Sequence, residues 1–228
     1  MAKRPIFFSS DKQDSLLQTR EVDFQWHPGL SVSQKQKSIE SLHIAAKEQF
    51  NLNNILEISS KSKNSLGVSL SAFNLCLTNK DNILATVEVF FQGSKVFVHG
   101  GPYKDLYQKT PREAKKDQRL LESGDLLKFS FDDKNWPLTP PTIFYDFLYC
   151  TALTQNPEQA GALLDYEAFT DIEFNPNKSI NCQAASAAIY KSLVNKSLIA
   201  EAMESYTKFI KIHNKYATSN QLIQVGLF

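Results

Sequence analysis

Residues 86–101 read TVEVFFQGSKVFVHGG, and this stretch decides both the local fold and the candidate chemistry. Thr86 is a residue type that caps helix N-termini, and a glycine pair such as 100–101 is typical of a helix end. We therefore expect a helix over residues 87–98. In that helix Glu88, Gln92 and Lys95 share one face, because they are spaced i, i+4 and i+7.

The other positions of this predicted helix are largely apolar, and Phe91 lies next to the polar stripe. A helix that is apolar on most sides is expected to be buried. Its carboxylate, amide and ammonium groups would then line a cavity, which favours an active site. The alternative is an exposed polar stripe, whose helical pairs stabilise by only about 0.2–0.5 kcal/mol each.

Working outward, the chain alternates short extended segments with longer helical ones, which predicts a mainly helical α+β fold with a few short strands. We expect a single domain over 1–228, with an N-terminal extension at about 1–30 and a polar tail at about 215–228. The expected strands are 4–9, 21–26, 55–58, 126–131 and possible extended chain at 169–174. The expected helices are 31–50, one starting at 110, 140–155, one starting at 157, 181–194 and 197–214.

A second group of polar residues lies in residues 170–183, TDIEFNPNKSINCQ. Asp171 and Glu173 are separated by one residue, so in an extended segment both point to the same face. Paired carboxylates can divide acid and base duties if their environments separate their pKa values. Asn181 and Gln183 either cap the following helix or hold a ligand.

A third group, EISSKSK at 57–63, is rich in donors that suit a phosphate, namely Ser60, Lys61 and Ser62, yet it lacks the glycines of a P-loop. Basic residues also gather at 35–37 with 61–63, and along 109–119. Each cluster is either a phosphate-contacting surface or a solvated face.

Composition limits the alternatives. A formal net charge of +1 argues against a nucleic-acid binder that works by overall charge, and 16 Phe with 8 Tyr supply a packed core. Cys76, Cys150 and Cys182 lie far apart among apolar neighbours, which predicts buried free thiols. We expect no metal or cofactor, because no His or Cys spacing suits one. Without an apolar run of membrane-spanning length or a signal-peptide core, we expect a cytoplasmic protein with no membrane partner.

Several phrases, in the same order, resemble one protein family. VEVFFQGSK (87–95) resembles the glutamate–aromatic–Gln–x–x–Lys helix of the NADAR superfamily, and KNW (134–136) is similar to its Asn-Trp segment. LGVSLSAFNL (66–75) looks like its Gly and Ser-Asn-Phe segment, although Ala-Phe-Asn replaces Ser-Asn-Phe here. GGPYKDLY (100–107) and FTDIEFNPNKSINCQA (169–184) resemble the branch paired with DNA-guanine ADP-ribosyltransferase toxins.

The resemblance implies a mostly helical fold, an ADP-ribose pocket, and an antitoxin that hydrolyses ADP-ribose from guanine bases in DNA. The implied partners are ADP-ribosylated DNA and the cognate toxin. The expected catalytic residues are Glu88, Lys95 and Glu173. The expected substrate-binding residues are Ser60, Lys61, Ser62, Asn74, Phe91, Gln92, Lys115, Trp136, Asp171 and Asn181.

This reaction agrees with the residue types. Breaking an N-glycosidic bond develops positive charge on the sugar, which a carboxylate such as Glu88 stabilises. Lys95 is either a Schiff-base nucleophile or an electrostatic partner of the carboxylates. Phe91 or Trp136 could stack on a base. Two other functions stay open: an N-glycosidase of a riboflavin-pathway intermediate, and a non-catalytic reader of ADP-ribosylated nucleic acid.

Overall fold

The computed structural model describes residues 1–177 and 179–216. The chain divides into two compact units, one formed by Met1–Ser71 with Glu158–Phe228 (the first unit) and one by Ala72–Pro157 (the second unit). Helical residues outnumber strand residues in the described chain, which confirms the mainly helical α+β fold. The single domain over 1–228 stays a prediction, because compactness alone does not show whether the units fold independently.

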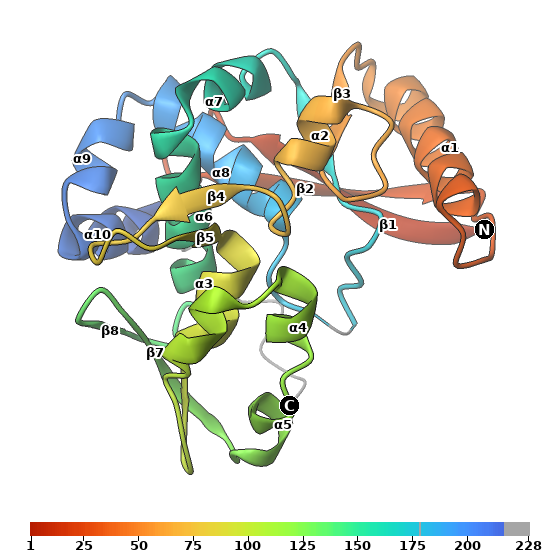
Figure 1. Cartoon of the computed structure of the whole chain (residues 1–228). Coiled ribbons are helices and arrows are strands. Elements are labelled where there is room, and N and C mark those ends of the chain that lie inside the picture. The colour runs from red at the N-terminus through yellow and green to blue at the C-terminus, as the bar shows by residue number, and fades with distance from the viewer. Residues whose placement is uncertain (178, 217–228) are drawn as a thin grey trace. The chain divides into compact units, whose positions relative to one another are not determined.

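The first unit contains a four-stranded sheet in the order β2-β1-β9-β3 (Figure 1). Strand β1 pairs antiparallel with β2 along its whole length and with β9 at Phe7 and Phe169, while β9 runs parallel to β3. The residues assigned to an N-terminal extension therefore supply two strands of this sheet. The strands are β1 (Ala2–Ser9), β2 (Leu17–Phe24), β3 (Ile55–Glu57) and β9 (Ala168–Thr170).

Helix α1 (Val32–Phe50) packs against this sheet. Ser31 caps it by accepting a hydrogen bond from the Gln34 N–H, and it ends at Asn51, whose φ of 54° is left-handed. The predicted helix at 31–50 is thus confirmed. Its buried apolar stripe joins a core contributed by both β1 and β2, with Ile6, Val22, Phe24, Ile39, Leu42 and Ala46 at its centre.

The C-terminal helices of the first unit differ from the prediction in one place. The expected helix over 197–214 is interrupted at Ser205, where φ of −159° and ψ of 154° are extended and end the helical hydrogen-bond ladder. Residues 217–228 of the predicted tail lie outside the described residues. The helices are α2 (Ser65–Ser69), α8 (Gln183–Asn195), α9 (Ile199–Glu204) and α10 (Tyr206–Tyr216), and α7 (Pro157–Leu163) begins at the unit boundary.

The second unit corrects the predicted helix over 87–98. Helix α3 (Val87–Gly93) ends five residues before the predicted end, and β6 (Lys95–Phe97) pairs with β7 (Leu126–Phe131) instead. Gly93 packs against Tyr107, and a Cβ there would lie 2.6 Å from that ring. Val96, Phe97 and Val98 are β-branched or aromatic, which favours pairing in a sheet over another helical turn.

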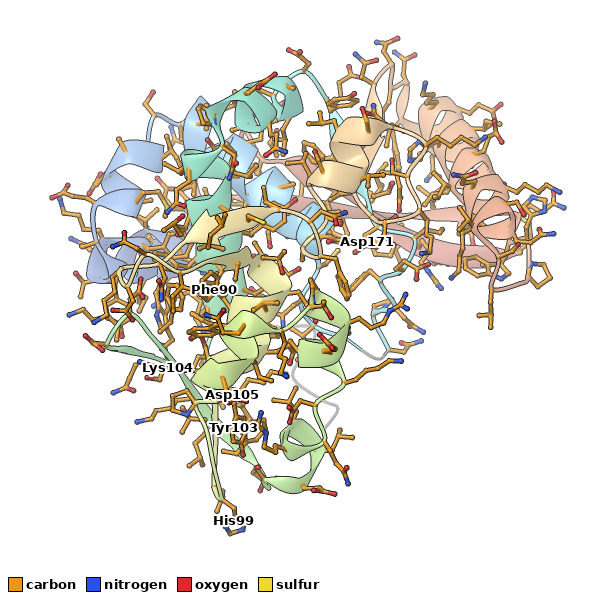
Figure 2. All side chains as sticks on the ribbon, viewed as in Figure 1. Phe90, His99, Tyr103, Lys104, Asp105 and Asp171 are labelled. Carbon is orange, nitrogen blue, oxygen red and sulfur yellow. The ribbon has the colours of Figure 1, made fainter. Side chains whose placement is uncertain are left out.

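The remaining elements of the second unit surround α3 with aromatic side chains. Phe90 lies in edge contact with Tyr107 and Phe131, at centroid distances of 4.8 and 5.3 Å. In Figure 2, Phe90 lies in the interior of this unit and His99 at the outer end of the β6–β7 connection. The elements are β4 (Cys76–Thr78), β5 (Leu84–Thr86), α3 (Val87–Gly93), the 3-10 helix η1 (Lys104–Gln108), α4 (Pro111–Lys115), α5 (Arg119–Glu122), β8 (Lys134–Trp136) and α6 (Ile143–Gln155).

Candidate functional site

Glu88 lies in the first turn of α3 with only 5% of its surface exposed. Thr86 caps the helix by accepting from the Val89 N–H, as the sequence predicts, and the Glu88 N–H donates to the Ala72 carbonyl at 2.9 Å. These bonds fix the backbone around the carboxylate from both sides. Every residue of α3 is buried, so the exposed-stripe interpretation of this helix is wrong.

The Glu88 carboxylate has an amide and an ammonium as partners. Gln92 Nε2 donates to Glu88 Oε1 at 2.9 Å, and Lys115 Nζ lies 3.5 Å from the same oxygen. The Lys115 ammonium also lies 5.2 Å from the centre of the Phe73 ring. Glu88 Oε2 accepts no hydrogen bond from any described residue. The second carboxylate oxygen is therefore available to a substrate atom.

Lys95 approaches this group from a strand and not from the predicted helical face. It begins β6, and its ammonium lies 5.0 Å from the centre of the Phe91 ring. Burial lowers the pKa of Lys95 to about 8, an effect that Glu88 opposes and Lys115 reinforces. At pH 7 roughly a tenth of a lysine with this pKa is a neutral amine. We call Glu88, Gln92, Lys95 and Lys115 the Glu88 cluster.

The aromatic residues expected to stack on a base are buried. Trp136 is 1% exposed and its ring lies 4.4 Å from that of Phe147 and 5.4 Å from that of Phe144. Phe91 is 8% exposed and contacts the ring of Phe129 at 5.2 Å. Both rings pack in the core of the second unit, and their stacking on a base stays a prediction. Asn74 is exposed, and its carbonyl accepts from Cys76 Sγ.

A second polar group lies in the first unit, where the parallel strands β3 and β9 end side by side. Glu57 is 2% exposed and pairs in register with Thr170. Its Oε2 accepts from Thr170 Oγ1 at 2.6 Å, and its Oε1 accepts from the Ile172 N–H at 2.9 Å. His43 Nε2 lies 2.9 Å from Thr170 Oγ1, within hydrogen-bonding distance.

The histidine and the two carboxyl groups of this site have pKa values shifted from their ordinary ones. Burial, with a smaller effect of Lys47, lowers the pKa of His43 to about 4, so the ring is neutral at pH 7. Burial also raises the pKa of Glu57, against the effect of its hydrogen bonds. For Asp171, burial and then the charge of Glu57 raise the pKa. We call Glu57, His43, Thr170 and Asp171 the Glu57 cluster.

The predicted shared face of Asp171 and Glu173 is wrong. The chain turns after Thr170, and Asp171 Oδ1 accepts from the Glu173 and Phe174 N–H groups at 3.0 and 3.2 Å. This side chain-to-backbone turn directs Glu173 to the surface. There Glu173 pairs with Lys35 at 3.0 Å. Asp171 is labelled at this turn in Figure 2.

Neither Asn181 nor Gln183 caps α8. The N-cap is Cys182, without a side-chain capping bond, whereas Gln183 Nε2 donates to the Ile58 carbonyl at 2.7 Å and the same side chain bonds to Asp171. Gln183 thus joins the start of α8 to β3 and the Asp171 turn. Asn181 Oδ1 is buried without a hydrogen-bond partner among the described residues. Asn181 therefore stays a substrate-binding prediction.

The phosphate-friendly loop folds tightly after β3. Lys61 Nζ donates to the exposed Ser60 at 3.1 Å, and Ser62 is buried and accepts from the Asn64 N–H. A Cβ at Gly67 would lie 2.0 Å from the Glu57 carbonyl oxygen and 2.6 Å from Ser62 Oγ, so this position requires glycine. Ser60 and Lys61 remain accessible to a phosphate, while the Ser62 hydroxyl is used inside the loop.

Glu57, His43 and Thr170 were not identified as site residues from the sequence. One signal was present for Glu57, because a carboxylate interrupts the apolar run of a buried strand. His43 follows directly after Leu42 of the buried stripe of α1, a position at which a histidine most often serves packing. Their convergence depends on strand pairing between residues more than a hundred positions apart, which no local pattern encodes.

The described residues contain no group of three or more His, Cys, Asp or Glu side chains that could hold a metal ion. Among them, too, no helix is both long and apolar enough to cross a membrane. Cys76, Cys150 and Cys182 are free thiols, as predicted. Cys150 and Cys182 are buried, whereas Cys76 is half-buried and departs from the expectation of full burial.

Comparison with known families gives a match over nearly the whole chain. A family model described as DarT1-associated NADAR antitoxin matches residues 2–222. The matched range contains all members of both the Glu88 and the Glu57 clusters. A search of curated proteins found no match.

Proposed function

The chain belongs to the family of DarT1-associated NADAR antitoxins, and from this premise we propose that it hydrolyses ADP-ribose from guanine bases in DNA. The proposed antitoxin action is the reversal of the modification that the partner toxin makes. NADAR proteins are associated in general with cleavage of N-glycosidic bonds. The proposal specifies the bond: the one that joins the sugar of ADP-ribose to the modified guanine.

The observation that carries the proposal is the composition of the Glu88 cluster. Cleavage of an N-glycosidic bond passes through an oxocarbenium-like state with positive charge on the sugar. A buried carboxylate with one uncommitted oxygen stabilises such a charge, and it does so most strongly where water is excluded. Glu88 meets these conditions, since its Oε1 is held by Gln92 and Lys115 while Oε2 accepts no bond from a described residue.

Lys95 supplies a second, covalent route. With a pKa of about 8, a fraction of its side chain is a neutral amine near pH 7. In this route the amine nitrogen bonds to the anomeric carbon as the bond to guanine breaks, and guanine leaves with a proton from the amine. The glycosylamine ring then opens: the bond from the anomeric carbon to the ring oxygen breaks, that oxygen takes a proton, and an iminium forms. Water adds to the iminium carbon and the amine leaves, which releases ADP-ribose. In the alternative route Lys95 acts only through its charge.

The first unit, taken by itself, carries four residues for which we propose substrate-binding roles. Ser60 and Lys61 offer a hydroxyl and an ammonium that suit the pyrophosphate. Asp171 and Asn181 offer acceptors that suit ribose hydroxyls or a base amino group. Glu173 remains the proposed second carboxylate, although its ion pair with Lys35 must open before it contacts a substrate.

The proposal is tested with DNA carrying ADP-ribose on guanine. Wild-type protein is incubated with the modified DNA, and released ADP-ribose and restored guanine are measured by mass spectrometry. We expect both products in equal amounts, and neither with Glu88→Gln protein of the same melting temperature. Folded wild-type protein that leaves the modified DNA intact would overturn the proposal.

A further inference from the structure

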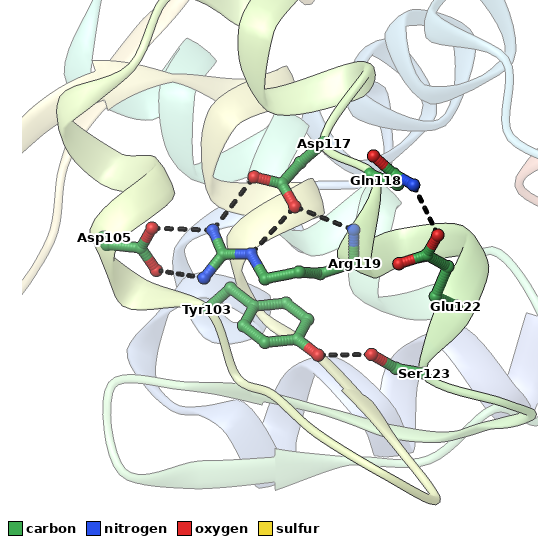
Figure 3. Close-up of polar contacts among 7 residues, drawn as sticks. All are labelled: Tyr103, Asp105, Asp117, Gln118, Arg119, Glu122 and Ser123. Carbon is green, nitrogen blue, oxygen red and sulfur yellow. Dashed lines mark hydrogen bonds and ion pairs between the residues drawn. The ribbon is translucent and has the colours of Figure 1, made fainter.

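In residues 105–119, the segment that carries Lys115, the carboxylates accept hydrogen bonds from side chains and backbone of the same segment. Arg119 donates to Asp105 at 2.6 and 3.2 Å and to Asp117 at 2.8 and 2.9 Å (Figure 3). These contacts lower the pKa of both aspartates. Glu113 accepts from the Thr110 N–H and hydroxyl in the capping box of α4.

The cations of the same segment are left exposed. Lys109, Arg112 and Lys116 are all exposed, and none of them forms an ion pair with a residue that the structure describes. Lys109 acts on its acidic neighbours only at longer range, where it lowers the pKa of Glu113 and of Asp117. The acidic side chains nearby, such as Glu113 and Asp105, are exposed too, but each already accepts hydrogen bonds from within the segment. The cations therefore have more capacity left for a ligand of opposite charge than the carboxylates have.

We infer that Lys109, Arg112 and Lys116 bind the phosphodiester backbone beside the modified base; this rests on the proposed function. The three residues are called the α4 cations. Arg112 lies three residues before Lys115 and four before Lys116, so these side chains lie on neighbouring parts of one helical face. Lys115 in turn contacts Glu88 at 3.5 Å. The α4 cations therefore extend outward from the candidate catalytic carboxylate.

The link of these side chains to Glu88 through Lys115 favours the phosphates of the substrate over a carboxylate-rich protein surface. An arginine fork binds two phosphate oxygens at once, and lysines contribute point charges along a strand. Arg112 and Lys116 are separated by about 6 Å along a helix axis, close to the roughly 7 Å that two stacked nucleotides span. A modified base that reaches Glu88 as part of a DNA strand brings its flanking phosphates with it.

The same internal contacts hold this surface in place. The Arg119 guanidinium lies 4.4 Å from the centre of the Tyr103 ring, and the Tyr103 hydroxyl contacts Ser123 at the end of α5. Figure 3 shows Arg119 between Asp105 and Asp117. The contact with Asp105 joins the start of α5 to η1, the elements that follow and precede α4 in the chain. The α4 cations thus lie within and directly beside a short helix, between segments that these contacts hold together.

The test compares two substrates that share the bond to be cleaved. One is ADP-ribosylated guanosine, which has no flanking phosphates, and the other is a short single-stranded oligonucleotide with one ADP-ribosylated guanine. For K109Q/R112Q/K116Q we expect unchanged kcat/KM on the nucleoside. On the oligonucleotide we expect KM to rise about tenfold or more at low salt, and the log–log salt slope to fall by about 2, or roughly 0.7 per lost contact.

The matched control is K12Q/K47Q/K211Q, which removes the same charge from exposed lysines of the first unit. We expect it to behave as wild type on both substrates. Equal activity of the α4 variant and wild type on the oligonucleotide would overturn the inference, as would an equal loss with the control or an equal loss on the nucleoside. If the variant bound the purified partner toxin more weakly while its DNA kinetics stayed normal, the surface would belong to the toxin and the inference would also fall. Failure of wild type on both substrates would instead refute the proposed function.

Discussion

Glu88 and Glu57 are both almost fully buried, yet their surroundings differ in kind. Glu88 has an ammonium and an amide as partners, and one of its oxygens accepts no bond from the described chain. Glu57 is held on both oxygens, by a hydroxyl and a backbone amide, and a neutral histidine supports the hydroxyl. An ammonium partner offsets the free-energy cost of burying a negative charge. Neutral donors offset a smaller part of that cost.

Burial alone therefore does not distinguish the candidate catalytic carboxylate from the other buried one. Burial raises the pKa of Glu57 and Asp171, and the hydrogen bonds of both carboxyl groups to backbone N–H groups hold the turn after β9 in shape. The Glu88 cluster combines a carboxylate with two lysines, one of which has a lowered pKa. The second arrangement suits a reaction that develops charge, and the first suits a fixed polar scaffold.

The largest expected effect follows from Glu88→Gln. This near-isosteric change removes the charge and keeps the packing, so we expect turnover to fall by about a thousandfold or more. The melting temperature should change little. Product release is measured by mass spectrometry alongside a thermal melt. A loss below about tenfold, or roughly 1.4 kcal/mol of barrier, would remove Glu88 from the catalytic role.

The second test concerns the protonation of Lys95. Its pKa is lowered to about 8, so the nucleophilic amine is scarce below that pH. In the covalent route the rate should therefore rise about tenfold per pH unit and level off above pH 8, and Lys95→Met should lose about a hundredfold. Borohydride added during turnover should leave an adduct on Lys95. Full activity of Lys95→Arg without any trapped adduct would leave only the electrostatic role.

A smaller effect is expected from Lys115→Gln. An ion pair with a half-exposed lysine contributes no more than about 1 kcal/mol, so kcat on the nucleoside should fall about fivefold or less. Because Lys115 lowers the pKa of Lys95, the midpoint of the pH–rate profile should also move upward. Lys134→Gln, at an exposed site of the same unit, is the control and should leave the midpoint unchanged.

The smallest effect lies in the Glu57 cluster and concerns stability. A carboxyl group with a raised folded-state pKa stabilises most below its unfolded pKa, and this contribution is lost as pH rises through the folded value. Asp171→Asn removes the titration and can keep the two backbone hydrogen bonds. Raising the pH from 5 to 8 should thus lower the melting temperature of wild type by about 2–4 °C more than that of Asp171→Asn.

Thermal melts at both pH values, with the exposed Asp11→Asn as control, measure this difference. The control should follow wild type. A larger drop for Asp171→Asn than for wild type would contradict the assignment of a retained proton to this cluster, and with it the contrast between the two buried carboxylates.

The sequence by itself determined the features that depend on neighbouring residues. The Ser31 and Thr86 caps, the capping box at Thr110 and the β7 strand all form as predicted. Caps and short-range patterns involve groups within one or two turns, so their signal is contained in a few residues. The order of several motifs also sufficed to indicate the family.

The tertiary structure decided which polar groups meet. Lys95 leaves the helix because β6 gains a partner strand, and Lys115 reaches Glu88 from another helix. Glu57 and Thr170 become neighbours only through the parallel pairing of β3 with β9. Burial and long-range pairing set these contacts and the resulting pKa shifts, because desolvation depends on what surrounds a group in space and not on its neighbours in the chain.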